Sequence, residues 1–149
     1  QPRTEILLFL AARAQLVEEV IRPALAQGKI ILSDRYADST LAYQGYGHGV
    51  DLALLRLLLD FATGGLRPDL TLLLDVDPAV GLSRRRSSGG EWNRLDAYAL
   101  EFHQRVRQGY LTMAQQEPTR WRVVDASQPP DVVQSALSQL VLNRLRCDV

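Results

Sequence analysis

Apolar residues in the first part of the chain recur at the spacing of an α-helix. They are Ile6, Phe9, Leu10, Ala14, Val17, Val20 and Ile21. This pattern predicts a long helix over residues 4–27, with Thr4 as its N-cap and Gly28 just after its last turn. Because Pro23 has no backbone N–H, we expect the helix to kink or divide there.

Three short apolar runs of a different kind follow. Residues 29–34 and 70–76 are apolar on both faces, which is typical of parallel strands covered by helices, and residues 121–125 are expected to form a third strand. Further helices are expected over residues 39–44, 51–63, 78–86, 96–115 and 129–146. The alternation of strands and helices predicts a single α/β domain over residues 1–149, with a parallel sheet flanked by helices.

Composition narrows the classes of partner. Seventeen basic and seventeen acidic residues cancel, which argues against nucleic acid, since proteins that bind it are usually basic. The apolar runs are too short to span a bilayer, so no membrane partner is expected. The single cysteine, Cys147, permits no disulfide within the chain and fits a reducing, cytoplasmic location.

Polar residues follow the predicted strands at their carboxyl ends. Asp34 and Arg35 end the first run, and the other two runs also end in acid. In open α/β sheets the ligand crevice lies outside these strand ends, which favours a nucleotide or phosphate ligand. Arg35 could reach a phosphate and Asp34 could hold a magnesium ion. An isolated Asp-Arg pair is more often a surface ion pair or part of a turn.

Two pairs of residues share a helical face. Phe9 and Arg13 are four residues apart, so a ring that stacks a base and a guanidinium that binds its edge could lie together. Thr40 and Gln44 have the same spacing, and Tyr43 lies between them, placed to pack on a sugar. Each pattern also fits ordinary structure: a core phenylalanine beside a half-exposed arginine, and an amphipathic turn.

Arginines surround a glycine-rich stretch near the middle of the chain. They are Arg84, Arg85, Arg86 and Arg94. Arginines on a flexible loop can close over a triphosphate and spread its charge, so residues 84–95 are a candidate lid. A solvated run of charge is the alternative.

Four stretches together resemble the thymidylate kinase family in its bacterial form. They are LLFLAARAQ (7–15), DRYADSTLAYQGYG (34–47), RPDLTLLLDVDPAVGLSRR (67–85) and VVDASQPPDVV (123–133). Their order and spacing match that family over residues 7–140. The resemblance implies a P-loop NTPase-like sheet and transfer of a phosphoryl group from ATP to dTMP, giving dTDP, with Mg²⁺ as cofactor.

The resemblance also implies a role for each candidate residue. The implied dTMP site comprises Phe9, Arg13, Arg35, Ser39, Thr40, Tyr43 and Gln44. The implied ATP-binding residues are Arg84, Arg86, Arg94, Ser127 and Gln128. The implied catalytic residues are Asp34, Arg35, Arg86 and Arg94, with Asp34 beside the metal.

The chain departs from the family pattern in two places. The lid motif Asp-Arg-x-Glu reads Asn-Arg-Leu-Asp over residues 93–96, and the phosphate-binding loop G-x-x-x-x-G-K-[ST] is absent. We therefore expect the C-terminal portion of a longer enzyme, inactive on its own. A related deoxynucleoside kinase, which tends to have Glu-Arg-Ser at residues 34–36, and a non-catalytic nucleotide-binding fragment are the alternatives.

The first predicted helix carries more apolar residues than one core face needs. Leu7, Leu8, Leu16 and Val20 widen its stripe. Members of the family are homodimers built on such helices, so a homodimer through this helix is expected. A helix buried within the monomer is the alternative.

Overall fold

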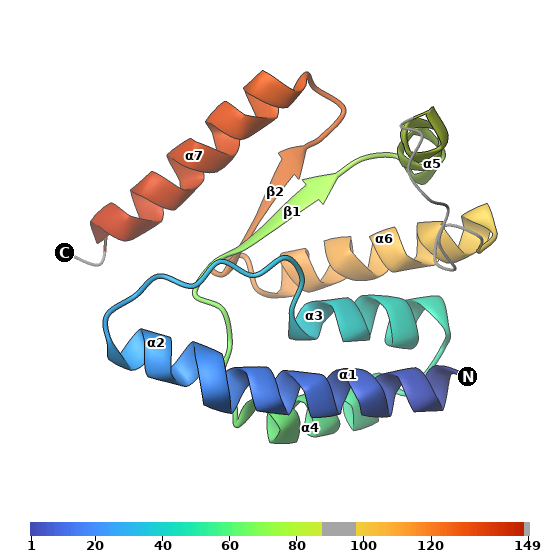
Figure 1. The fold of residues 1–149 in the computed structure, drawn as a ribbon. Coiled ribbons are helices and arrows are strands. Elements are labelled where there is room, and N and C mark those ends of the chain that lie inside the picture. Colours follow the sequence, from blue (N-terminus) through green and yellow to red (C-terminus); the bar gives the residue numbers. More distant parts are fainter. Residues whose placement is uncertain (88–97, 148–149) are drawn as a thin grey trace. The chain divides into compact units, whose positions relative to one another are not determined.

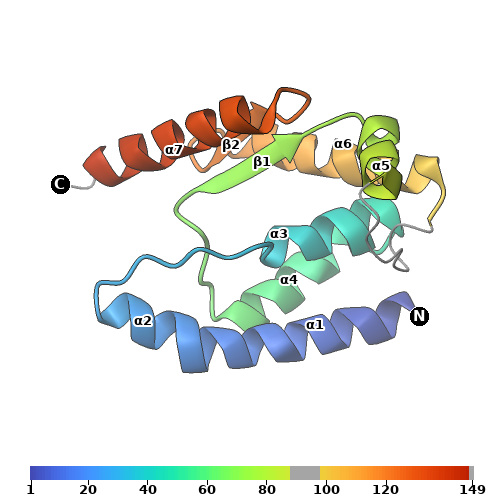
Figure 2. The same ribbon diagram turned by 45° about the horizontal axis from the view of Figure 1, so that its top comes forward.

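The structure is a computed structural model that describes residues 1–87 and 98–147. Contacts between residues gather into two compact units, Gln1–Arg67 and Pro68–Val149. The first unit is helical, and the second contains a small sheet with helices packed on it (Figures 1 and 2). Among the described residues, no helix combines the length and the apolar character needed to cross a membrane.

The first unit begins with a long helix in three segments. They are α1 (Pro2–Leu16), the π-helical turn η1 (Val17–Ile21) and α2 (Arg22–Ala26). The N-cap is Gln1 and not the predicted Thr4, because proline suits the first turn of a helix and Pro2 occupies it. The predicted division at Pro23 is confirmed. The backbone N–H of Arg22 donates to the Val17 carbonyl in a widened turn just before the proline, which cannot donate.

The prediction of a strand over residues 29–34 is wrong. This segment runs without regular secondary structure, and its apolar side chains Ile30 and Leu32 are 71% and 93% exposed. A strand exists only when a neighbour accepts and donates its backbone hydrogen bonds. The described residues place no partner strand beside this segment, so its apolar character alone does not make it a strand.

Two further helical stretches complete the first unit. The short helix expected near residues 39–44 is present as α3 (Ala37–Thr40), which continues into the π-helix η2 (Leu41–Gly47). The helix α4 (Leu52–Thr63) packs against α1. Together the helices bury an apolar core that comprises Ile6, Leu10, Val17, Ile21, Leu41, Ala42, Leu55 and Leu59.

The second unit confirms the parallel α/β pattern for two of the three predicted strands. β1 (Thr71–Asp75) and β2 (Trp121–Asp125) pair in parallel, with Asp75 opposite Asp125 at their carboxyl ends. α6 (Leu100–Gln116) lies on one side of this pair and α7 (Pro130–Cys147) on the other (Figure 1).

α5 (Pro78–Ser87) follows β1 directly. Arg84, Arg85 and Arg86 therefore lie on the last turn of a helix and not on a loop. Most of the predicted lid, including Arg94, lies outside the described residues.

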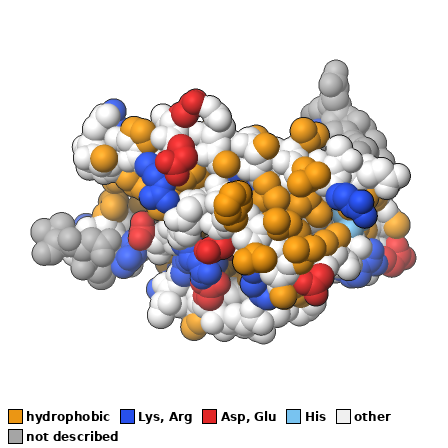
Figure 3. All heavy atoms as spheres, turned by 90° about the horizontal axis from the view of Figure 1, so that it is seen from below, with side chains coloured by type: hydrophobic (Ala, Val, Ile, Leu, Met, Phe, Trp, Pro, Cys, Tyr) orange, Lys and Arg blue, Asp and Glu red, His pale blue; other side chains and the backbone are white. Residues whose placement is uncertain are grey.

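Apolar side chains remain on the surface of α1 and η1. Leu7, Leu8, Leu16 and Val20 are all exposed, Leu8 to 65%. In the view from below, apolar side chains gather on one face of the molecule (Figure 3).

Candidate functional site

Arg13 connects two predicted site segments of the first unit. Its Nη1 donates a hydrogen bond to the Oγ1 of Thr40 at 3.1 Å, and its Nη2 donates to the backbone carbonyl of Tyr36 at 3.1 Å. Thr40 is only 2% exposed. The structure thus brings together two residues that the resemblance assigned to the dTMP site.

Tyr36 contacts Arg13 through its ring as well as through its backbone carbonyl. The guanidinium carbon of Arg13 lies 5.6 Å from the centroid of the Tyr36 ring, a cation–π distance. The Tyr36 hydroxyl donates to the Leu66 carbonyl at 3.3 Å, and burial raises its pKa. Burial lowers the pKa of Arg13, against the opposing influence of Tyr36 and Asp38. An arginine stays charged in proteins, so this is a partly desolvated cation held in one place.

Gln44 meets the same helix nearer its N-terminus. It is 3% exposed, and its Nε2 donates to the Oε2 of Glu5 at 3.5 Å. Phe9 lies between Glu5 and Arg13 along α1, and the residue is 49% exposed, which leaves it accessible for stacking. Glu5 was not among the predicted residues. Its four-residue spacing from Phe9 is the signal that could have identified it.

Arg35 contacts Tyr43, a second pair that the sequence had assigned to one ligand. The Nη2 of Arg35 donates to the Tyr43 hydroxyl at 3.2 Å, and its guanidinium carbon lies 5.0 Å from the ring centroid. Arg35 has φ of +67°, a left-handed conformation that costs energy for a residue with a side chain. The Ser33 hydroxyl donates to the Arg35 carbonyl at 2.8 Å and helps to hold this turn.

Asp34 and Ser39 lie on either side of this turn. Asp34 is exposed and Ser39 is half-buried at the start of the helical stretch. Within the described part of the chain, no group of three or more His, Cys, Asp or Glu side chains is placed to hold a metal ion. The carboxylate of Asp34 is a ligand type that Mg²⁺ accepts, with water and phosphate oxygens as the remaining ligands.

The second unit brings together three of the five predicted ATP-binding residues. Arg84 donates from Nη1 to the Ala126 carbonyl at 2.6 Å and from Nη2 to the Ser127 carbonyl at 3.0 Å. Asp125 accepts from the backbone N–H of Ser127 at 2.9 Å and from the Nε2 of Gln128 at 3.0 Å. Hydrogen bonds from these two residues lower the pKa of Asp125 to about 2. The turn after β2 is therefore fixed by hydrogen bonds from Arg84 to its carbonyls and by hydrogen bonds to the carboxylate of Asp125.

The remaining predicted ATP-binding residues of this unit are Arg86 and Arg94. Arg86 lies on the last turn of α5, and Arg94 is outside the described residues. Sequence reasoning missed Arg107 of α6, which binds the Asp75 carboxylate at 2.7 and 2.8 Å and thereby lowers its pKa. This ion pair fixes the acid at the carboxyl end of β1.

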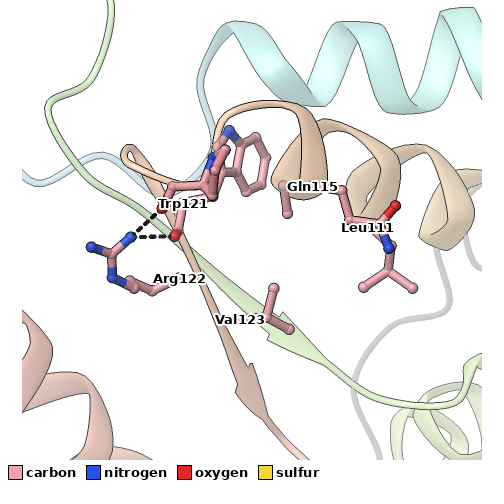
Figure 4. A pocket seen from close by; sticks show the side chains of 7 residues that line it. Leu111, Gln115, Trp121, Arg122 and Val123 are labelled. Atoms are coloured by element: carbon pink, nitrogen blue, oxygen red, sulfur yellow. Dashed lines mark hydrogen bonds between the residues drawn. The ribbon is translucent and has the colours of Figure 1, made fainter.

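A shallow hollow of about 280 Å³ lies elsewhere in the second unit, between α6 and β2 (Figure 4). Leu111, Gln115, Trp121 and Val123 contribute to its lining. None of the predicted site residues lines it. The hollow is therefore separate from the turn at Ser127.

Comparisons with known proteins identify the family to which the chain is similar. The family model described as thymidylate kinase matches residues 1–137. The chain is 54% identical over 151 residues to the thymidylate kinase of Roseiflexus sp. (strain RS-1), covering 94% of this chain and 67% of the relative. It is 58% identical over 137 residues to that of Thermomicrobium roseum, covering 92% of this chain and 65% of the relative. The chain thus spans about two thirds of the length of these curated relatives. It belongs to the thymidylate kinase family.

Proposed function

We propose that this chain contributes the dTMP site and part of the ATP-binding region of a thymidylate kinase, which transfers the γ-phosphoryl group of ATP to the 5′-phosphate of dTMP. The observation that carries the proposal is Arg13, held by Thr40 and Tyr36 beside the half-exposed ring of Phe9. Family membership supplies the reaction class and the P-loop NTPase fold.

The base site follows from the chemistry of three side chains. Phe9 offers a ring on which thymine can stack. Arg13 carries only donors, so it suits a carbonyl oxygen on the edge of the base. Its partial desolvation strengthens such a bond relative to one made in water. Thr40 fixes Arg13, and Gln44 supplies the second polar contact.

The phosphate end of dTMP would meet Arg35. A guanidinium binds a phosphate through two parallel hydrogen bonds, and Tyr43 beneath Arg35 bounds the space for the sugar. Phosphoryl transfer demands alignment and charge neutralisation more than covalent work by the protein. When bound, Mg²⁺ neutralises phosphate charge, and Asp34 is the residue that would hold it. Ser39 completes the proposed acceptor site.

We place the proposed binding region for ATP, the phosphoryl donor, in the second unit. Arg84 holds the turn at Ala126 and Ser127, and Gln128 is held by Asp125, so these residues could border ATP. Arg86 and Arg94 are proposed to approach its phosphates.

We also propose a homodimer through α1. The exposed side chains of Leu7, Leu8 and Leu16 on α1, and of Val20 on the adjoining η1, supply apolar surface along the first helix. Burying such side chains between two copies would contribute a favourable free energy in proportion to the area removed from water.

Binding of dTMP, measured by isothermal titration calorimetry, tests the acceptor site without depending on the donor phosphates. We expect dTMP to bind the wild-type chain and R13M to bind it at least about tenfold more weakly, because a charged hydrogen bond is lost. R3M, which changes an exposed arginine of the same helix, is the matched control and should bind normally. A wild-type chain that does not bind dTMP would refute the proposal. Thymidine bound as tightly as dTMP would favour a deoxynucleoside kinase instead.

A further inference from the structure

Three side chains share one face of α1, and two of them contact the helical stretch α3–η2. Glu5, Phe9 and Arg13 follow one another at four-residue steps, which places them on one face of the helix. Across from them, Thr40 contacts Arg13 and Gln44 contacts Glu5. Phe9, the proposed platform for the base, therefore stands between two hydrogen-bonded pairs.

The two pairs offer a ligand different hydrogen-bonding groups: the Arg13–Thr40 pair offers a donor and the Glu5–Gln44 pair offers an acceptor. Arg13 has only donors, and some of its N–H groups remain beyond those given to Thr40 and Tyr36. The ionised carboxylate of Glu5 has only acceptors, so the NH₂ group of Gln44 must be the one that faces it. The other branch of the same amide, the Oε1 of Gln44, is then held as an acceptor.

We propose that Glu5 is a positioning residue that sets the base specificity of this site by fixing the amide of Gln44 in one orientation. A base stacked on Phe9 then meets a donor from Arg13 and an acceptor from Gln44. Thymine presents the complementary pair, the O4 acceptor beside the N3–H donor. Cytosine presents the reverse, an N4 amino donor beside the N3 acceptor, and would leave both protein groups unpaired. This inference rests on the proposed dTMP site.

The burial of Gln44 makes its orientation consequential. The side chain is 3% exposed, so water cannot readily compensate an amide that points the wrong way. A site built to hydrogen-bond a ligand rejects an analogue with mismatched groups, because its own buried polar atoms lose their partners. An amide free to turn over would accept either base. The carboxylate of Glu5 removes that freedom.

The test compares dTMP with 5-methyl-dCMP, which has the same methyl group, sugar and phosphate and reverses only the edge of the base. Both affinities are measured by calorimetry in competition, so that the fraction of folded protein cancels in their ratio. In E5Q the new amide can donate or accept, and the amide of Gln44 can turn over. We expect the preference of the wild type for dTMP to fall about tenfold in E5Q. E19Q makes the same change at an exposed residue of η1, which contacts Gln15, and should keep the wild-type preference.

The outcomes separate the inference from the function on which it rests. A selective wild type with an E5Q variant of equal selectivity would overturn the role of Glu5 and leave the dTMP site intact. Equal loss of affinity for both nucleotides in E5Q and in E5A would also overturn it, because that result indicates a structural role alone. A wild-type chain that binds both nucleotides equally would overturn the inference, because there would then be no specificity for Glu5 to set. A wild-type chain that binds neither nucleotide would instead refute the proposed dTMP site.

Discussion

Replacement of Thr40 by valine tests the contact at the centre of the first unit. The side chains have the same shape, but valine removes the Oγ1 that accepts the 3.1 Å hydrogen bond from Arg13. A hydrogen bond to a charged group contributes about 1.5–3 kcal/mol to stability. The added methyl group of valine returns about 0.8 kcal/mol, because Thr40 is almost fully buried. We therefore expect T40V to lower the free energy of unfolding by about 1–2 kcal/mol.

Urea unfolding followed by circular dichroism measures this loss, since the first unit is almost entirely helical. The slope of the unfolding free energy against urea should stay constant while the midpoint falls. T4V makes the same substitution at an exposed residue of α1 and should leave the midpoint near the wild-type value. Because Arg13 keeps only its bond to the Tyr36 carbonyl, dTMP should bind about fivefold to tenfold more weakly. A T40V variant with wild-type stability and wild-type dTMP affinity would refute the reasoning.

Two further results are expected. Hydrogen bonds lower the pKa of Asp125 to about 2 from 3.8, so the stability they supply is present above pH 3.8 and is lost as the pH falls towards 2. In an acid titration D125N should therefore lose less stability than the wild type over that range, and equal losses would contradict this. A charge at exposed Leu8 should disrupt the proposed α1 interface, so L8E should sediment as a monomer, whereas L142E on α7 should not. A wild type that sediments as a monomer at micromolar concentration would count against the dimer.

Local patterns predicted the helices well, because a helix satisfies its backbone within its own segment. Apolar spacing located the helix over residues 4–27, and Pro23 located its division. The exact start was wrong: Thr4 was the predicted N-cap, but the helix begins at Pro2 because proline suits the first turn of a helix.

Strands depend on residues far away in the sequence, so their prediction is less secure. The apolar runs over residues 70–76 and 121–125 contain β1 and β2, which pair in parallel with Asp75 opposite Asp125. Residues 29–34 have the same apolar character but no partner among the described residues. Apolar character on both faces therefore shows that a segment can lie in a sheet, and the pairing itself decides whether it does.

In the candidate site, too, the sequence predicted which residues share a helical face but not which residues of a distant segment contact them. Four-residue spacing correctly placed Phe9 with Arg13 on one face, because helical geometry is local. It could not show which residues of α3–η2 would lie opposite that face. Only the packing of the two helical stretches reveals that Gln44 meets Glu5, an acid that resembles an ordinary solvated residue of a first helical turn. The specificity proposed for this site therefore depends on a contact that neither segment encodes alone.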